Sequence, residues 1–143
     1  MTISPAITKL VADANLGTLA TIKRDGRPQL SNVNYHFDPE TLLLRVSVVD
    51  GRAKVLNLRR DPRASLLVNG AGGWTYAVLE GDAKFSEVAR AVDDAAVEEL
   101  IDVYRDVGGK EHPDWDEYRE AMVADHRLVL RIKVTHAYGL AAR

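Results

Sequence analysis

The chain has 143 residues, 46% of them hydrophobic and 28% charged, and its 19 basic and 21 acidic side chains give a formal net charge of −2. These values are typical of one globular domain, residues 1–143, with a sizeable core. The lack of cysteine excludes disulfides, thiolate metal sites and thiol nucleophiles, and the slightly acidic charge argues against nucleic acid as a partner.

No apolar run approaches the roughly 20 residues that span a bilayer. The first residues also lack the basic and apolar regions of a signal peptide. We therefore expect a cytoplasmic protein that does not bind membranes.

The first third of the chain predicts a helix followed by three strands. Ser4 can cap the helix and Pro5 fits its first turn. Its apolar positions follow helical spacing: Ile7, Leu10, Val11 and Ala14. Strands are predicted over residues 16–23, 28–37 and 41–49, and Asp25-Gly26 joins the first two in a hairpin.

The remaining elements are read in the same way. A helix is predicted over residues 52–60, and strands over 63–69 and 74–86 flank a glycine-rich loop. Two helices follow, one over 94–107 and one that begins after Asp114, whose spacing to Glu117 is that of a capping box. In a last strand over 127–138, strict alternation places one set of residues on a single face: Leu128, Leu130, Ile132, Val134, His136 and Tyr138.

Six strands joined mostly as hairpins, with helices at the ends, predict a mainly β, α+β fold: a small six-stranded antiparallel barrel with peripheral helices. The nucleotide-binding glycine motifs are missing. The four histidines lack metal-ligand spacing, so we expect no metal site.

A basic segment, residues 52–63, holds five of the 19 basic residues. It fits either a solvated helix face or a site for an anion such as phosphate. Arg52 and Lys54 stand at the start of the helix, where free backbone N–H groups also favour an anion, and Asn57 adds a neutral donor. The other three are expected at the surface or in ion pairs: Arg59, Arg60 and Arg63.

Two further groups have two interpretations each. Trp74 and Tyr76, predicted to share a strand face after the glycine-rich loop, are either core aromatics or the wall for a flat ring. Asn32, Asn34 and His36 share the polar face of the second strand, which is either simply exposed or lines a cleft that binds a heterocycle. His136 is expected to be structural.

Several of these segments together resemble a known family, the pyridoxamine-phosphate-oxidase-like split-barrel proteins with the FMN-binding fold. The opening hairpin 19–33 and the basic segment 52–63 are similar to that family as a whole. Segments 73–78, 80–81, 111–115 and 136–139 resemble its actinobacterial branch, which uses the deazaflavin coenzyme F420. The resemblance covers residues 16–138 approximately.

The resemblance implies a homodimer with cofactor sites at the interface, and it implies roles for ten residues. Arg52, Lys54 and Asn57 would hold the phosphate and acidic tail of the cofactor. The deazaflavin and its ribityl chain would be lined by Ser31, Asn32, Ser47 and Val48. Further wall residues, from either subunit, would be Trp74, Tyr76 and Ala77.

The implied activity is that of an F420H2-dependent reductase that transfers a hydride to a small unsaturated or aromatic molecule. The sequence identifies no catalytic side chain, and hydride transfer needs none because the cofactor carries the reactive atom. Two alternatives stay open: an FMN-dependent oxidase or reductase, and a non-catalytic F420-binding carrier. The additional substrate-binding residues of true pyridoxamine-phosphate oxidases are not found, which argues against vitamin B6 oxidation.

Overall fold

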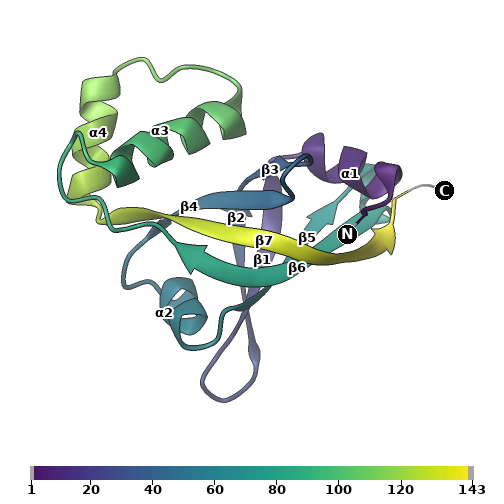
Figure 1. Ribbon diagram of the computed structural model, residues 1–143. Coiled ribbons are helices and arrows are strands. Elements are labelled where there is room, and N and C mark those ends of the chain that lie inside the picture. Colours follow the sequence, from purple (N-terminus) through teal and green to yellow (C-terminus); the bar gives the residue numbers. More distant parts are fainter. Residues whose placement is uncertain (1, 142–143) are drawn as a thin grey trace.

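The computed structural model describes residues 2–141, which form an antiparallel sheet with helices around it (Figure 1). The strands are β1 (Leu16–Ile22), β2 (Pro28–Asn34), β3 (His36–Asp38), β4 (Leu43–Val49), β5 (Arg63–Asn69), β6 (Tyr76–Phe85) and β7 (Arg127–Leu140). The helices are α1 (Pro5–Ala12), α2 (Ala53–Arg60), α3 (Ala95–Gly108) and α4 (Trp115–Ala124), with a 3₁₀ turn η1 (Ala71–Gly73).

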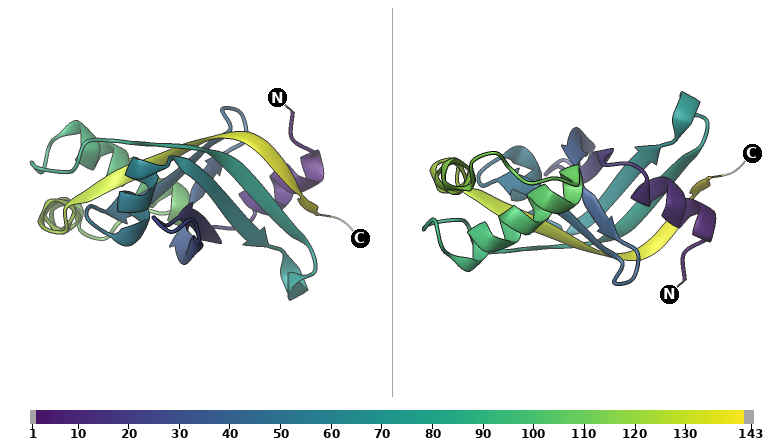
Figure 2. Two further views of the ribbon diagram at one scale, coloured as in Figure 1. Left: turned by 90° about the horizontal axis from the view of Figure 1, so that it is seen from below. Right: turned by 90° about the horizontal axis from the view of Figure 1, so that it is seen from above.

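The sheet has the order β2-β1-β5-β6-β7-β4-β3, and every neighbouring pair is antiparallel. It curls so that β2, at one end of this order, contacts β4 near the other end. Helices α3 and α4 lie together at one end of the sheet and α1 at the opposite end (Figures 1 and 2). The mainly β split-barrel fold with peripheral helices is thus confirmed.

The strand count is seven rather than the predicted six, because the segment 28–37 is interrupted at Tyr35. Up to Asn34 the segment pairs with β1, and from His36 onwards it pairs with β4. At the change of partner, the Tyr35 N–H donates to the Asn15 carbonyl oxygen (2.9 Å), and its buried hydroxyl donates to the Val11 carbonyl oxygen (2.6 Å). One extended segment therefore forms the strands at both ends of the sheet order, and its strand pairing is interrupted where it changes partner.

The alternation predicted for the last strand holds only as far as Val134. A bulge pairs Glu80 with His136 but Gly81 with Val134, so that Thr135 is an extra residue in β7. An extra residue reverses the two faces: Ala137 packs against the core, while His136 and Tyr138 are exposed. The prediction that these two residues share the face of Leu128 was wrong.

Two groups of buried side chains make up the core. The larger fills the curled sheet and includes Leu19, Tyr35, Leu44 and Leu66. The smaller lies under α3 and α4, where the predicted apolar stripe of Val97, Leu100 and Ile101 is buried against Tyr118, Met122 and Val129.

Local signals at the helix ends are confirmed in part. Ser4 takes the N-cap position of α1 and Pro5 begins that helix, but the Ser4 side chain makes no capping hydrogen bond. The Asp114 carboxylate accepts a hydrogen bond from the Glu117 N–H (3.1 Å), which caps α4. The strand predicted over 74–86 is shorter, because Trp74 ends η1 and β6 begins only at Tyr76. Between residues 2 and 141 there is no helix long and apolar enough to cross a membrane.

Candidate functional site

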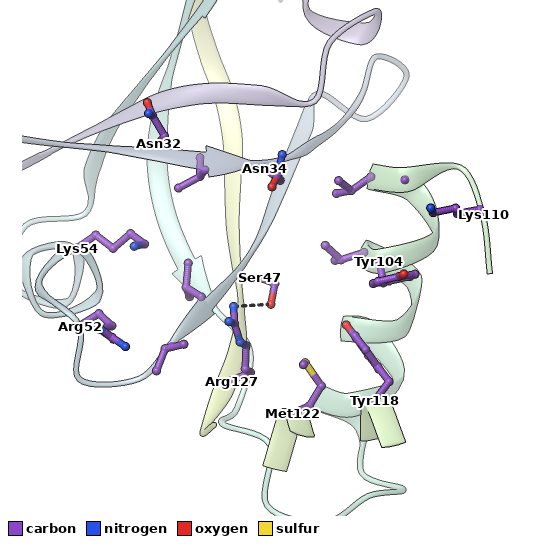
Figure 3. Close-up of a pocket in the computed structure, with 16 residues that line it drawn as sticks. Asn32, Asn34, Ser47, Arg52, Lys54, Tyr104, Lys110, Tyr118, Met122 and Arg127 are labelled. Carbon is purple, nitrogen blue, oxygen red and sulfur yellow. Dashed lines mark hydrogen bonds between the residues drawn. The ribbon is translucent and has the colours of Figure 1, made fainter. Parts of the chain in front are cut away.

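A pocket of about 650 Å³ opens between the curled sheet and the α3–α4 helices (Figure 3). It lies beside the place where β2 approaches β4, with the start of α2 on one side and the two helices on the other. Its lining consists of Asn32, Val33, Asn34, Ser47, Val48, Val49, Arg52, Lys54, Val103, Tyr104, Val107, Gly108, Lys110, Tyr118, Met122 and Arg127.

The charge in this lining has one sign. Four lining residues are cationic (Arg52, Lys54, Lys110 and Arg127), and the lining includes no carboxylate. Within residues 2–141 the side chains of Arg52 and Lys54 make no hydrogen bond or ion pair. Such a concave, positively charged surface attracts anions.

The electrostatic cost of this arrangement is visible at Lys54. Burial, together with the neighbouring charges of Arg52 and Arg127, lowers the pKa of the Lys54 ammonium below its usual value. Because its charged neighbours repel it, a bound anion would stabilise the charged form of Lys54. The local electrostatics therefore favour a phosphate or carboxylate ligand.

Arg127 reaches this site from a distant part of the sequence. The register of β4 with β7 pairs Val49 with Arg127, and the guanidinium then lies beside Ser47, whose hydroxyl accepts a long hydrogen bond from Nη1 (3.4 Å). Sequence analysis did not identify this residue. The sequence showed only a basic residue at the first position of the last predicted strand. Its place in the pocket depends on the pairing of β4 with β7, which the sequence did not specify.

The helical wall of the pocket is mostly apolar and held rigidly. The Tyr104 ring makes edge contacts with the rings of His112, Trp115 and Tyr118, with centroids 5.1 to 5.6 Å apart. The Tyr118 hydroxyl donates to the Leu100 carbonyl oxygen (2.8 Å), and burial raises the pKa of Tyr118 to about 12. Tyr118 is thus neutral at physiological pH, and its hydroxyl proton is used in the hydrogen bond to Leu100.

Five of the ten residues expected to bind the cofactor line this pocket: Asn32, Ser47, Val48, Arg52 and Lys54. Asn34, from the polar strand face, lines it as well, whereas His36 lies outside with Nδ1 3.9 Å from Asp106. Ser31, by contrast, is not in the lining.

Asn57 does not reach the pocket. It is 7% exposed, and its amide nitrogen donates to Thr21 Oγ1 (3.1 Å) and to Gln29 Oε1 (2.8 Å). Its amide oxygen accepts from Arg60 (3.2 Å), so the side chain ties α2 to the β1–β2 hairpin. Its hydrogen-bonding capacity is therefore used within the fold.

The remaining expected residues lie away from the pocket of the same chain. Tyr76 and Ala77 begin β6, and Trp74 precedes them; none of the three is in the lining. The later arginines of the basic segment have structural contacts, as expected: Arg59 pairs with Asp50 (3.6 Å), Arg60 donates to the Ile22 carbonyl oxygen (2.8 Å), and Arg63 pairs with Asp61 (2.8 Å).

Comparison with known proteins assigns the family. The family model described as pyridoxamine 5'-phosphate oxidase matches residues 3–141. The chain belongs to the pyridoxamine 5'-phosphate oxidase family. The resemblance inferred from the opening hairpin and the basic segment is thereby confirmed.

Known proteins that resemble this chain include one described as F420H2-dependent and one described as an F420 reductase. An F420H2-dependent biliverdin reductase from Mycobacterium tuberculosis is 28% identical over 131 residues, which cover 92% of this chain and 83% of that protein. A structure of a conserved hypothetical protein from Mycobacterium tuberculosis has a TM-score of 0.73 and 26% identity, covering 99% of this chain and 86% of the other. A structure called an F420 reductase has a TM-score of 0.70 and 21% identity, covering 95% and 98%, and shows the shared fold.

Proposed function

We propose that this protein is a coenzyme F420H2-dependent reductase that transfers a hydride to a small unsaturated or aromatic molecule. Membership of the family and the 28% identical reductase support an oxidoreductase of the F420 or flavin type. The observation that carries the proposal is the meeting of Arg52 and Lys54 in a pocket lined by four cations and no carboxylate. A cofactor with a phosphate and an acidic tail matches that charge.

The residues present fit such a cofactor. Arg52 and Lys54 would hold its phosphate, since both side chains lack other partners within the described chain. Asn32 and Ser47 offer hydrogen-bonding groups to the ring and the ribityl chain, and Val48 offers an apolar contact. When bound in its reduced form, the coenzyme would supply the hydride, and the chain's own residues would bind and orient both reactants.

The hydride acceptor would lie against the α3–α4 wall. That wall presents Val103, Val107 and Met122 together with the ring of Tyr104, which its neighbours hold in a fixed orientation. An apolar, rigid surface of this kind favours a flat, conjugated molecule over a flexible polar one. Tyr118 is a poor proton donor, because its hydroxyl proton is engaged by the Leu100 carbonyl oxygen.

A second copy of the chain would complete the site. Large apolar side chains are exposed away from the pocket, among them Trp74 (74% exposed), Leu30 (64%) and Leu16 (56%). Burying such side chains in a homodimer would remove apolar surface from water. In that dimer Trp74 and the neighbouring Tyr76 would face the partner's pocket. Ala77 would not, because it is buried in the core of its own chain.

A binding titration tests the proposal. The purified protein should bind coenzyme F420 with micromolar or better affinity, and FMN much more weakly, as followed by the fluorescence of each ligand. Equal or tighter binding of FMN would favour a flavin-dependent oxidase or reductase instead. Tight F420 binding without oxidation of F420H2 by any member of a broad panel of quinones, enones and nitroaromatics would indicate a carrier.

A further inference from the structure

Arg127 has a buried donor for which the described chain provides no acceptor. Its Nε is inaccessible to solvent and makes no hydrogen bond within residues 2–141. The nearest carboxylate oxygen, on Asp125, is 3.9 Å away, which is too far for a hydrogen bond. A buried N–H without an acceptor is rare in native structures, so the contact with Asp125 does not satisfy this guanidinium within the described chain.

The position of this guanidinium points to an anion. Arg127 lines the pocket together with Arg52 and Lys54, and it contributes to the repulsion that lowers the pKa of Lys54. Figure 3 shows Lys54 reaching into the pocket from α2, while Arg127 reaches toward Ser47 from β7. Three cations from two separate elements thus face one cavity, and the lining offers no carboxylate to balance them.

We propose that Arg127 is a third ligand of the anion held by Arg52 and Lys54, with Ser47 orienting its guanidinium. The inference rests on the proposed function only in taking that anion to be the phosphate of the coenzyme. A guanidinium presents parallel N–H groups that match two oxygens of a phosphate, which an ammonium cannot do. Arg127 would therefore contribute geometry as well as charge.

The competing interpretation is that Arg127 has only a structural role, as the ion-pair partner of Asp125 in the turn before β7. Four variants separate the two: Arg127→Gln removes the charge, Arg127→Lys keeps it without the planar fork, and Asp125→Asn removes the competing carboxylate. Arg90→Gln is the charge control, because Arg90 is an exposed residue outside the pocket lining.

Each variant is titrated with coenzyme F420 by fluorescence and with inorganic phosphate by calorimetry. We expect Arg127→Gln to weaken both ligands at least tenfold and Arg127→Lys to weaken them by a smaller factor. Asp125→Asn and Arg90→Gln should bind within twofold of the wild type. A urea unfolding curve for each variant identifies any that is not folded, and Arg127→Lys then replaces Arg127→Gln in the comparison.

Unchanged affinity in the Arg127 variants would overturn the inference, and so would a lack of saturable phosphate binding by the wild type. Equal losses in Arg127→Gln and Asp125→Asn would also overturn it, because Arg127 would then act with Asp125 in the fold. The proposed function can fail separately. If the wild type does not bind coenzyme F420 but its phosphate binding depends on Arg127, the anion site is supported and the assignment of F420 as the cofactor is wrong.

Discussion

Replacing Lys54 with methionine should change ligand affinity and protein stability in different directions. Methionine keeps most of the length of the side chain and removes the charge. Lys54 has no hydrogen bond or ion pair to lose within the described chain, and its charged neighbours Arg52 and Arg127 repel it. The ligand-free variant should therefore be at least as stable as the wild type, as measured by the urea midpoint.

The affinity for the coenzyme should fall. A hydrogen bond to a charged group contributes about 1.5–3 kcal/mol, which corresponds to a dissociation constant roughly 10- to 150-fold higher. Fluorescence titration of F420 measures this change, and Lys84→Met, at an exposed position of β6 outside the pocket, is the matched control. Affinity within threefold of the wild type, or a clear loss of stability, would refute the placement of the anion at Lys54.

The same residue predicts a dependence on pH. The folded, ligand-free protein has a Lys54 pKa below the usual 10.5, and a bound anion would raise it again. F420 affinity should therefore be constant at lower pH and fall as the pH rises through the lowered pKa, and Lys54→Met should not show this decline. The free energy of unfolding of the ligand-free protein changes in the opposite direction. The unfolded chain binds the Lys54 proton more tightly than the folded chain does, so the free energy of unfolding should rise from the lowered pKa up to about pH 10.5.

Three further substitutions test the fold around the site. Asn57→Ala should lower the free energy of unfolding by about 1–3 kcal/mol, because buried partners lose their hydrogen bonds, while F420 affinity of the folded protein changes little. Asp94→Ala should cost about 0.5–2 kcal/mol at neutral pH, since Asp94 caps α3. Burial acts to raise the pKa of Asp94, but backbone N–H groups outweigh it and hold the pKa below 3.8, so urea curves of the two proteins should converge below that pH. Gly81→Ala should yield little soluble protein or a strongly lowered melting temperature, because its Cβ would lie 2.1 Å from the Lys133 carbonyl oxygen.

Features set by neighbouring residues could be predicted from the sequence. The hairpin at Asp25-Gly26, the apolar stripe of α3 and the cap at Asp114 all depend on contacts within a few positions, and each is found as expected. The meeting of Arg52 and Lys54 in one pocket follows from their place at the start of α2. Local patterns were sufficient for these features because local hydrogen bonds and side-chain periodicity decide them.

Features set by strand pairing could not be predicted. The break at Tyr35 depends on a change of pairing partner, and the bulge at Thr135 depends on the register between β6 and β7. Arg127 lines the pocket because β7 pairs with β4. Asn57 does not line it, because its side chain is hydrogen-bonded to Thr21 and Gln29. Each involves residues far apart in the sequence, whose contacts no single-chain pattern specifies.

The central claim is that the pocket between α2, β4 and the α3–α4 helices binds coenzyme F420. A crystal structure of the protein with this coenzyme tests it most directly. We predict that the phosphate lies within hydrogen-bonding distance of Arg52 and Lys54, with the deazaflavin ring beside Asn32 and Ser47. A coenzyme bound elsewhere on the chain, or a phosphate that contacts neither Arg52 nor Lys54, would contradict the account.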